Sequence, residues 1–159
     1  MLQHIVSMLI LTGARKREVL DAKWEDFDIE RKSWRIPNTK AGKARIVPLS
    51  DTAIVVLMKL IKRKRGPYAF ANPITQKPYT SIYYSWHTAR KVAGLSDVRI
   101  HDLRHSFASF LVNAGRSLYE VQTLLGHTQI KTTQRYAHLS TTSLRSALNE
   151  VSLALPELA

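Results

Sequence analysis

The placement of glycine limits this 159-residue chain to short elements of secondary structure. Five of its six glycines directly follow segments with helical character, and glycine is the residue that most readily ends a helix. These five are Gly13, Gly66, Gly94, Gly115 and Gly126. The sixth, Gly42, lies in "NTKAGK", where an Ala-Gly pair suits a tight hairpin turn. The sequence therefore predicts short helices around a small sheet.

The expected elements give an α+β fold that is mainly helical. In the N-terminal third, "FDIE", "SWRIP" and "ARIVPL" alternate like strands and predict a three-stranded antiparallel sheet with a hairpin at 38–43. Ser50 is the expected N-cap of a helix that runs to Arg65, and Ser117 and Glu120 have capping-box spacing. Helices are expected at 2–11, 14–22, 51–65, 81–93, 102–114, 118–125 and 129–137, and an amphipathic one in the tail from Ser140.

Composition restricts the classes of function. The chain has no cysteine, which excludes disulfides, thiolate metal sites and cysteine nucleophiles and favours a reducing compartment. Its longest internal apolar run, "AIVVLMKLI", is well short of the roughly 20 residues of a membrane-spanning helix, and the N-terminus does not resemble a signal peptide. We therefore expect one cytoplasmic domain that does not bind membranes.

The net charge of +12 points to nucleic acid as the partner. The segment from Arg31 to Arg65 holds eleven Lys or Arg residues against one acid, Asp51, so one surface is expected to bind. The alternative is a basic surface that only keeps the protein soluble. For the run "KRKR" at 62–65, a second alternative is that it complements the negative end of a helix dipole.

The motif "HDLRH" places His101, Arg104 and His105 at offsets of three and four, so His101 can share a helix face with either partner. A zinc site would use the two histidines as an i, i+4 pair, but no neighbouring acid or cysteine completes a ligand set. We therefore expect His105 to be a buried, hydrogen-bonded structural histidine. Further on, His127 follows a helix stop and Tyr136 is expected on the next helix, so the two can converge from different elements.

A larger set of side chains has the types needed for metal-free transfer of a phosphodiester to a hydroxyl group. Two guanidinium groups can bind the non-bridging phosphate oxygens and offset the charge of the transition state. A tyrosine hydroxyl is a suitable nucleophile because phenolate is also a competent leaving group. An ammonium or imidazolium group protonates the departing sugar oxygen, and an imidazole accepts the tyrosine proton. The set is Arg15, Lys40, His101, Arg104, His127 and Tyr136.

Over about 5–139 the chain resembles the catalytic domain of the tyrosine recombinase (phage integrase) family. The resemblance is carried, in order, by "TGARKREVL", "WEDFDIE", "WRIPNTKAGKARIVPLS", "HDLRHSFAS" and "LLGHTQIKTTQRYAHL". It implies that Arg15 and Arg104 clamp the phosphate, Lys40 is the general acid and His101 manages the tyrosine proton. It also implies that His127 donates to the phosphate, Tyr136 forms a 3′-phosphotyrosine and Glu18 orients a guanidinium. Lys43, across the turn from Lys40, remains an alternative general acid, and Arg17 matches no role and is expected at the surface.

The resemblance further implies site-specific DNA recombination or integration of the kind found in prophages and genomic islands, without metal or nucleotide cofactor. Double-stranded DNA is the implied substrate, and a tetramer on DNA is the implied assembly. Residues 1–159 are expected to be an N-terminally truncated catalytic domain that lacks the family's core-binding domain, with a tail at 140–159 that docks on a neighbouring copy. Two alternatives remain: relaxation of DNA as by a type IB topoisomerase, and a DNA-binding module without catalysis.

Overall fold

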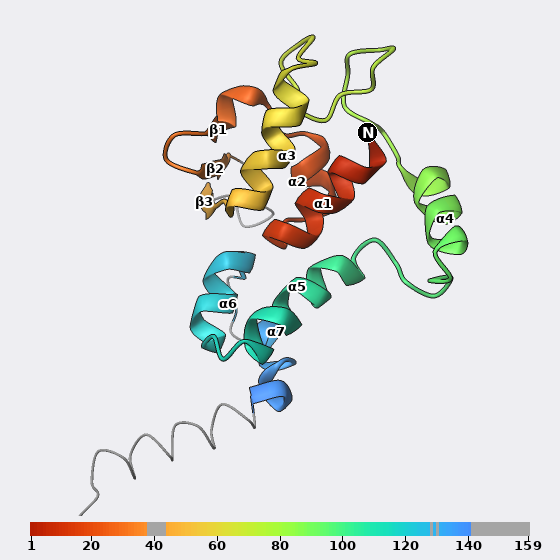
Figure 1. Ribbon diagram of the computed structural model, residues 1–159. Helices are drawn as coiled ribbons and strands as arrows, with labels where there is room; N and C mark the ends of the chain where they lie inside the picture. Colours follow the sequence, from red (N-terminus) through yellow and green to blue (C-terminus); the bar gives the residue numbers. More distant parts are fainter. Residues whose placement is uncertain (38–43, 128, 130, 141–159) are drawn as a thin grey trace, which may run out of the picture. The chain divides into compact units, whose positions relative to one another are not determined.

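The computed structural model describes residues 1–37, 44–127, 129 and 131–140, which Figure 1 draws as a coloured ribbon. The chain divides into two compact units, Met1–Phe107 and Ala108–Ala159, and helix α5 (Asp102–Asn113) runs from the first into the second. The expected hairpin turn at 38–43 and the expected tail helix at 141–159 lie outside the described residues.

The first unit contains the predicted three-stranded antiparallel sheet, and its strands lie in the order β1-β2-β3. Its strands are β1 (Phe27–Asp28), β2 (Ser33–Ile36) and β3 (Arg45–Pro48). Trp34 of the central strand pairs with Phe27 on one side and Val47 on the other. The rings of Phe27 and Trp34 stack with centroids 5.3 Å apart. Because side chains alternate along a strand, Trp34 and Ile36 are buried while Arg35 is exposed.

Helices pack against one another beside this sheet. The helix α1 (Leu2–Thr12) contacts both α2 (Lys16–Leu20) and α3 (Asp51–Ile61), and Figure 1 shows the three together. A short 3₁₀ helix, η1 (Trp24–Asp26), contacts β2, and α4 (Tyr83–Val92) follows a turn-rich loop. The apolar faces of α1, α2, α3 and the sheet form one core together with Phe70 of the loop, and its largest fully buried side chains are Trp34, Phe70, Ile5, Met8, Leu20 and Leu57. This core holds the end of α1 and the start of α2 in place, where the candidate site lies.

Helix α3 begins as predicted but ends earlier. The Ser50 hydroxyl accepts a hydrogen bond from the Ala53 amide at 3.3 Å, as an N-cap does. The helix ends at Ile61, so the prediction that it runs to Arg65 was wrong. Beyond it the chain turns and contacts the start of η1, where the Trp24 amide donates to the Pro67 carbonyl at 2.8 Å. The basic residues 62–65 are exposed after the helix rather than part of its last turn.

The second unit contains the end of α5, α6 (Leu118–Leu125), α7 (Lys131–Gln134) and the 3₁₀ helix η2 (Ala137–Ser140). The predicted capping box of α6 is confirmed: the Ser117 hydroxyl accepts from the Glu120 amide at 3.2 Å, and the Glu120 carboxylate accepts from the Ser117 amide at 2.8 Å. The predicted helix at 129–137 was wrong in its length. The Tyr136 amide bonds to the carbonyl of Thr133, three residues back, so the α-helical pattern ends and Tyr136 lies in a turn between α7 and η2.

The described fold confirms the predicted class, mainly helical with a small antiparallel sheet. The remaining helices also begin and end close to their predicted bounds, apart from α2, which is shorter at both ends. Of the helices in the described segments, none has both the length and the apolar character required to cross a bilayer.

Candidate active site

The site is built around the turn between α1 and α2. Gly13 ends α1 with φ 62° and ψ 15°, a left-handed conformation that glycine adopts at little cost. The Thr12 hydroxyl donates to the Met8 carbonyl at 2.6 Å and accepts from the Ala14 amide at 3.2 Å, which fixes the turn on both sides. As a result the next residue, Arg15, stands at the N-cap of α2 in an extended conformation.

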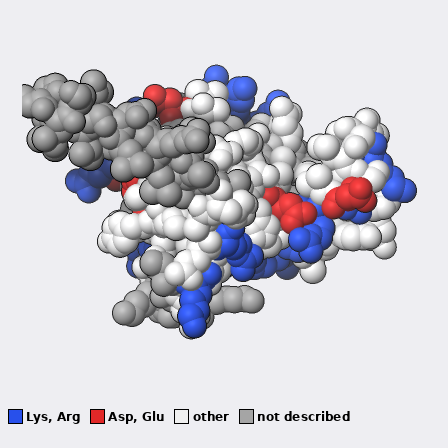
Figure 2. Space-filling model, turned by 90° about the horizontal axis from the view of Figure 1, so that it is seen from below, with Lys and Arg blue, Asp and Glu red and all other residues white. Residues whose placement is uncertain are grey.

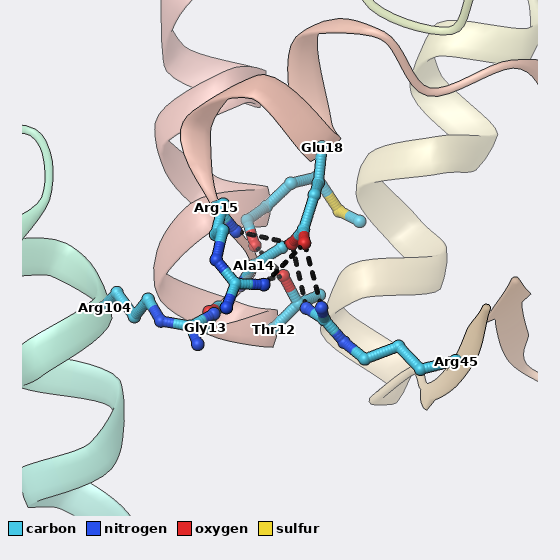
Figure 3. A network of polar contacts seen from close by, with 8 residues as sticks. Thr12, Gly13, Ala14, Arg15, Glu18, Arg45 and Arg104 are labelled. Carbon is cyan, nitrogen blue, oxygen red and sulfur yellow. Dashed lines mark hydrogen bonds and ion pairs between the residues drawn. The ribbon is translucent and has the colours of Figure 1, made fainter. Parts of the chain in front are cut away.

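Arg104 reaches the same turn from α5. Its Nη1 donates to the Gly13 carbonyl at 2.5 Å, and only 4% of the residue is exposed. Figure 3 shows the Arg104 and Arg15 side chains at the Gly13 turn, one arriving from α5 and the other from the start of α2. The structure thus brings together two guanidinium groups that are far apart in the sequence.

Glu18 lies at the centre of this cluster and accepts four hydrogen bonds. Its Oε1 accepts from Nη1 of Arg15 at 2.9 Å and from Nη1 of Arg45 at 2.9 Å. Its Oε2 accepts from the Arg15 backbone amide at 2.7 Å and from Nη2 of Arg45 at 2.8 Å. The contact with Arg15 is the one expected of Glu18. The sequence did not point to Arg45, because this residue begins β3, 27 positions after Glu18, and no helical spacing relates the two.

These bonds decide the charge of Glu18. Burial alone would raise the pKa of its carboxyl group. The hydrogen bonds from Arg45 and from the Arg15 amide outweigh burial, so the pKa lies below its ordinary value. Glu18 is therefore ionised at neutral pH. Its contribution to stability is present above the pKa of an unfolded Glu, about 4.3, and is lost as the pH falls through the lowered folded value.

His101 precedes α5 and is exposed, with its ring centroid 5.0 Å from that of His105. Partial burial lowers the pKa of His101, and the nearby charges of His105 and Arg104 lower it further, so the ring is neutral at pH 7. His105 is half-buried, so the prediction that it is buried was wrong. Within the described segments, no group of three or more His, Asp or Glu side chains is arranged to hold a metal ion.

The second unit holds the other two candidate residues. His127 follows Gly126, which ends α6 with φ 64°, so it lies in a loop as predicted. Its Nδ1 lies 2.9 Å from the Thr133 hydroxyl of α7, and its carbonyl accepts from Nε2 of Gln122 at 3.2 Å. Tyr136 follows α7 and is 5% exposed. His127 is therefore tied to the short helix that leads into Tyr136.

Lys40 and its alternative Lys43 lie outside the described residues. Arg17 is exposed as expected and forms an ion pair with Asp21, the C-cap of α2, while its Nη1 donates to the Tyr79 carbonyl at 3.0 Å. Figure 2 shows many Lys and Arg side chains on the face seen from below and fewer acidic ones, in line with the net charge of +12.

Comparison with known proteins gives the same family from sequence and from structure. The profile of the phage integrase family matches residues 1–143. The chain is 37% identical to the tyrosine recombinase XerA of Saccharolobus solfataricus over 142 residues, which are 89% of this chain and 47% of that protein. It is 32% identical to the integrase of Salmonella phage P22, covering 94% of this chain and 42% of that protein. The chain thus spans about half the length of these curated relatives.

Two solved structures extend the comparison. The catalytic domain of bacteriophage HP1 integrase superposes with a TM-score of 0.72 at 28% identity, covering 98% of this chain and 84% of that one. XerH recombinase, in a post-cleavage complex with a palindromic difH substrate, superposes with a TM-score of 0.75 at 29% identity, covering 92% of this chain and 44% of that one. With its sequence, fold and paired arginines in agreement, the chain belongs to the phage integrase family.

Proposed function

We propose that this protein carries out site-specific DNA recombination, cleaving and rejoining strands through a covalent 3′-phosphotyrosine. One observation carries the proposal: Arg15 and Arg104 meet at the Gly13 turn, where two guanidinium groups can bind one phosphodiester. Family membership supports it, as does the likeness to XerH, which was solved with its DNA substrate after cleavage. We propose that this protein is an integrase of the prophage or genomic-island type.

In the proposed reaction the Tyr136 hydroxyl attacks a backbone phosphorus and forms the P–O bond of a phosphotyrosine. His101 accepts the proton of the tyrosine, because its lowered pKa keeps the ring neutral. Lys40 protonates the 5′ oxygen as its bond to phosphorus breaks; Lys43 is the alternative donor. A 5′ hydroxyl of a partner strand reverses the step and conserves the energy of the linkage.

The remaining residues of the set stabilise the transition state in this proposal. Arg15 and Arg104 bind the non-bridging oxygens and offset the charge that develops on them, and His127 donates a further hydrogen bond. Glu18 orients Arg15. Because side chains supply the positive charge and the proton transfers, the step needs neither a metal ion nor a nucleotide.

We further propose that double-stranded DNA is the substrate and that four copies assemble on it. The tail at 140–159 would dock on a neighbouring copy. The cytoplasm is the proposed compartment, since the DNA substrate and a chain without cysteine both suit it.

The experiment is to incubate the 159-residue chain with nicked suicide DNA substrates and to map any DNA-linked peptide by mass spectrometry. We expect a covalent product with DNA attached to the peptide that contains Tyr136. Attachment to another residue would overturn the assignment of the nucleophile. Binding without any covalent product would favour a DNA-binding module, and relaxation of supercoiled plasmid without strand exchange would favour a topoisomerase.

The pH dependence of cleavage tests the role of His101. We expect the single-turnover rate constant to fall as the pH drops through the lowered pKa of His101, because the protonated ring cannot accept the tyrosine proton. His105→Gln removes one of the charges that lower this pKa, so the loss of rate should begin at a higher pH. The two profiles are compared between pH 5 and 8. A shift to lower pH, or an unchanged acid limb in His101→Ala, would contradict the role.

A further inference from the structure

Arg45 is the more deeply buried of the two arginine side chains that contact Glu18. The side chain of Arg45 is 12% exposed and that of Glu18 is 7% exposed, whereas the side chain of Arg15 is 29% exposed. In Figure 3 the Glu18 carboxylate lies between the two arginines, with Arg45 reaching it from β3. Exposure thus increases from Arg45 and Glu18 toward Arg15, which is the member of the cluster that a ligand can reach.

The hydrogen bonds are divided unequally between the two arginines. Arg45 uses both Nη atoms on Glu18, one for each carboxylate oxygen, which is the geometry in which a guanidinium binds a carboxylate most strongly. Arg15 donates one side-chain bond to the same carboxylate, from Nη1. Arg45 is therefore the principal partner of Glu18, and the guanidinium of Arg15 is held by a single bond that fixes its direction.

The net charge of Glu18, Arg15 and Arg45 follows from their ionised forms. Glu18 carries one negative charge and the two arginines carry two positive charges, so the three together have a net charge of +1. Without Arg45, the buried carboxylate would pair with Arg15 alone and the net charge would be zero. A phosphodiester carries one negative charge, and Arg45 raises by one the positive charge that it meets at Arg15, beside the charge that Arg104 brings to the same turn.

We propose that Arg45 is a positioning residue of the site, which binds the Glu18 carboxylate so that Arg15 keeps both its orientation and its positive charge for the scissile phosphate. This inference rests on the proposed function. Arg45 does not need to touch the DNA in this role, since it acts through Glu18. Its place as the first residue of β3, paired with Ile36 of β2, anchors it in the sheet.

The test is a set of variants of the 159-residue chain, assayed for single-turnover cleavage of the nicked substrate and for DNA affinity. Arg45→Gln should lower the cleavage rate by about 10²-fold, because a misplaced catalytic group costs about that much, while DNA affinity stays within about twofold. Arg45→Lys retains the charge and one donor and should give an intermediate rate. Arg17→Gln is the matched control. It removes an exposed arginine–carboxylate pair of α2, the helix that holds Glu18, and should leave the cleavage rate unchanged.

The double variant Glu18→Gln, Arg45→Gln separates this role from a loss of packing. It removes the carboxylate together with its main partner and so restores the net charge of +1 on the cluster. We expect it to cleave about tenfold faster than Arg45→Gln alone. The titration of the Glu18 carboxyl carbon, followed by NMR, should move to higher pH in Arg45→Gln. Burial raises the pKa of Glu18, and the variant removes the hydrogen bonds from Arg45 that lower it.

The possible outcomes separate this inference from the proposed function. A rate near that of the wild type in Arg45→Gln, or a double variant no faster than Arg45→Gln, would overturn the role of Arg45 while the proposed function stands. An unchanged Glu18 titration would overturn it as well. If the wild-type chain itself gives no covalent product, the proposed function fails, and the role that rests on it fails too.

Discussion

Replacing Tyr136 with phenylalanine is expected to abolish the covalent protein–DNA product. The change removes the hydroxyl oxygen that would form the bond to phosphorus and leaves the ring in its buried place, where 5% of the residue is exposed. No other group in the proposed mechanism can replace this oxygen. DNA affinity should stay within about twofold of the wild type, because phosphate contacts from Lys and Arg dominate such binding. Denaturing gels of the trapped product and a binding titration measure the two quantities.

Tyr119→Phe is the matched control for this variant. Tyr119 lies in α6 of the same unit and is 74% exposed, so losing its hydroxyl should change neither folding nor cleavage. Thermal unfolding of both variants checks that Tyr136→Phe remains folded, since the change is made at a residue that is only 5% exposed. A covalent product that persists in Tyr136→Phe would refute the assignment of the nucleophile, whatever happens in the control.

Local signals in the sequence were sufficient for much of the fold. The capping box at Ser117 and Glu120 determines where α6 begins, and Gly126 determines where it ends, because both act through bonds between near neighbours. The sheet was predictable from alternation, since Trp34 and Ile36 must face the core together. The short length of α7 was not predictable. The helix ends where the Tyr136 amide bonds to the Thr133 carbonyl in a 3₁₀ pattern, and no residue type there signals the end of a helix.

Some contacts of the candidate site could be predicted from the sequence, whereas others could not. The spacing of Arg15 and Glu18 by three residues predicts their contact, because an acid at the third position of a helix reaches back to the amide of the N-cap residue. The contact of Arg104 with the Gly13 carbonyl depends on how α5 meets a turn far away in the sequence, which no local pattern encodes. Arg45 was missed for the same reason. The general acid stays a prediction, since Lys40 and Lys43 lie outside the described residues.

Arg15→Ala is expected to lower the cleavage rate by about 10³-fold, the usual cost of removing a charged group that stabilises a transition state. The structure argues that this loss would not come from unfolding. The bond that begins α2 is made by the backbone amide of Arg15 to Glu18, which alanine retains, and Arg45 still binds the Glu18 carboxylate.

Arg17→Ala is the matched comparison: it also removes an arginine–carboxylate contact from α2, but one at the surface, where such pairs contribute about 0–1 kcal/mol. Single-turnover cleavage of both variants, with thermal unfolding alongside, should therefore show a large loss in Arg15→Ala and little change in Arg17→Ala. The reverse order would mean that the phosphate is bound by the outer face of α2 rather than at the Gly13 turn.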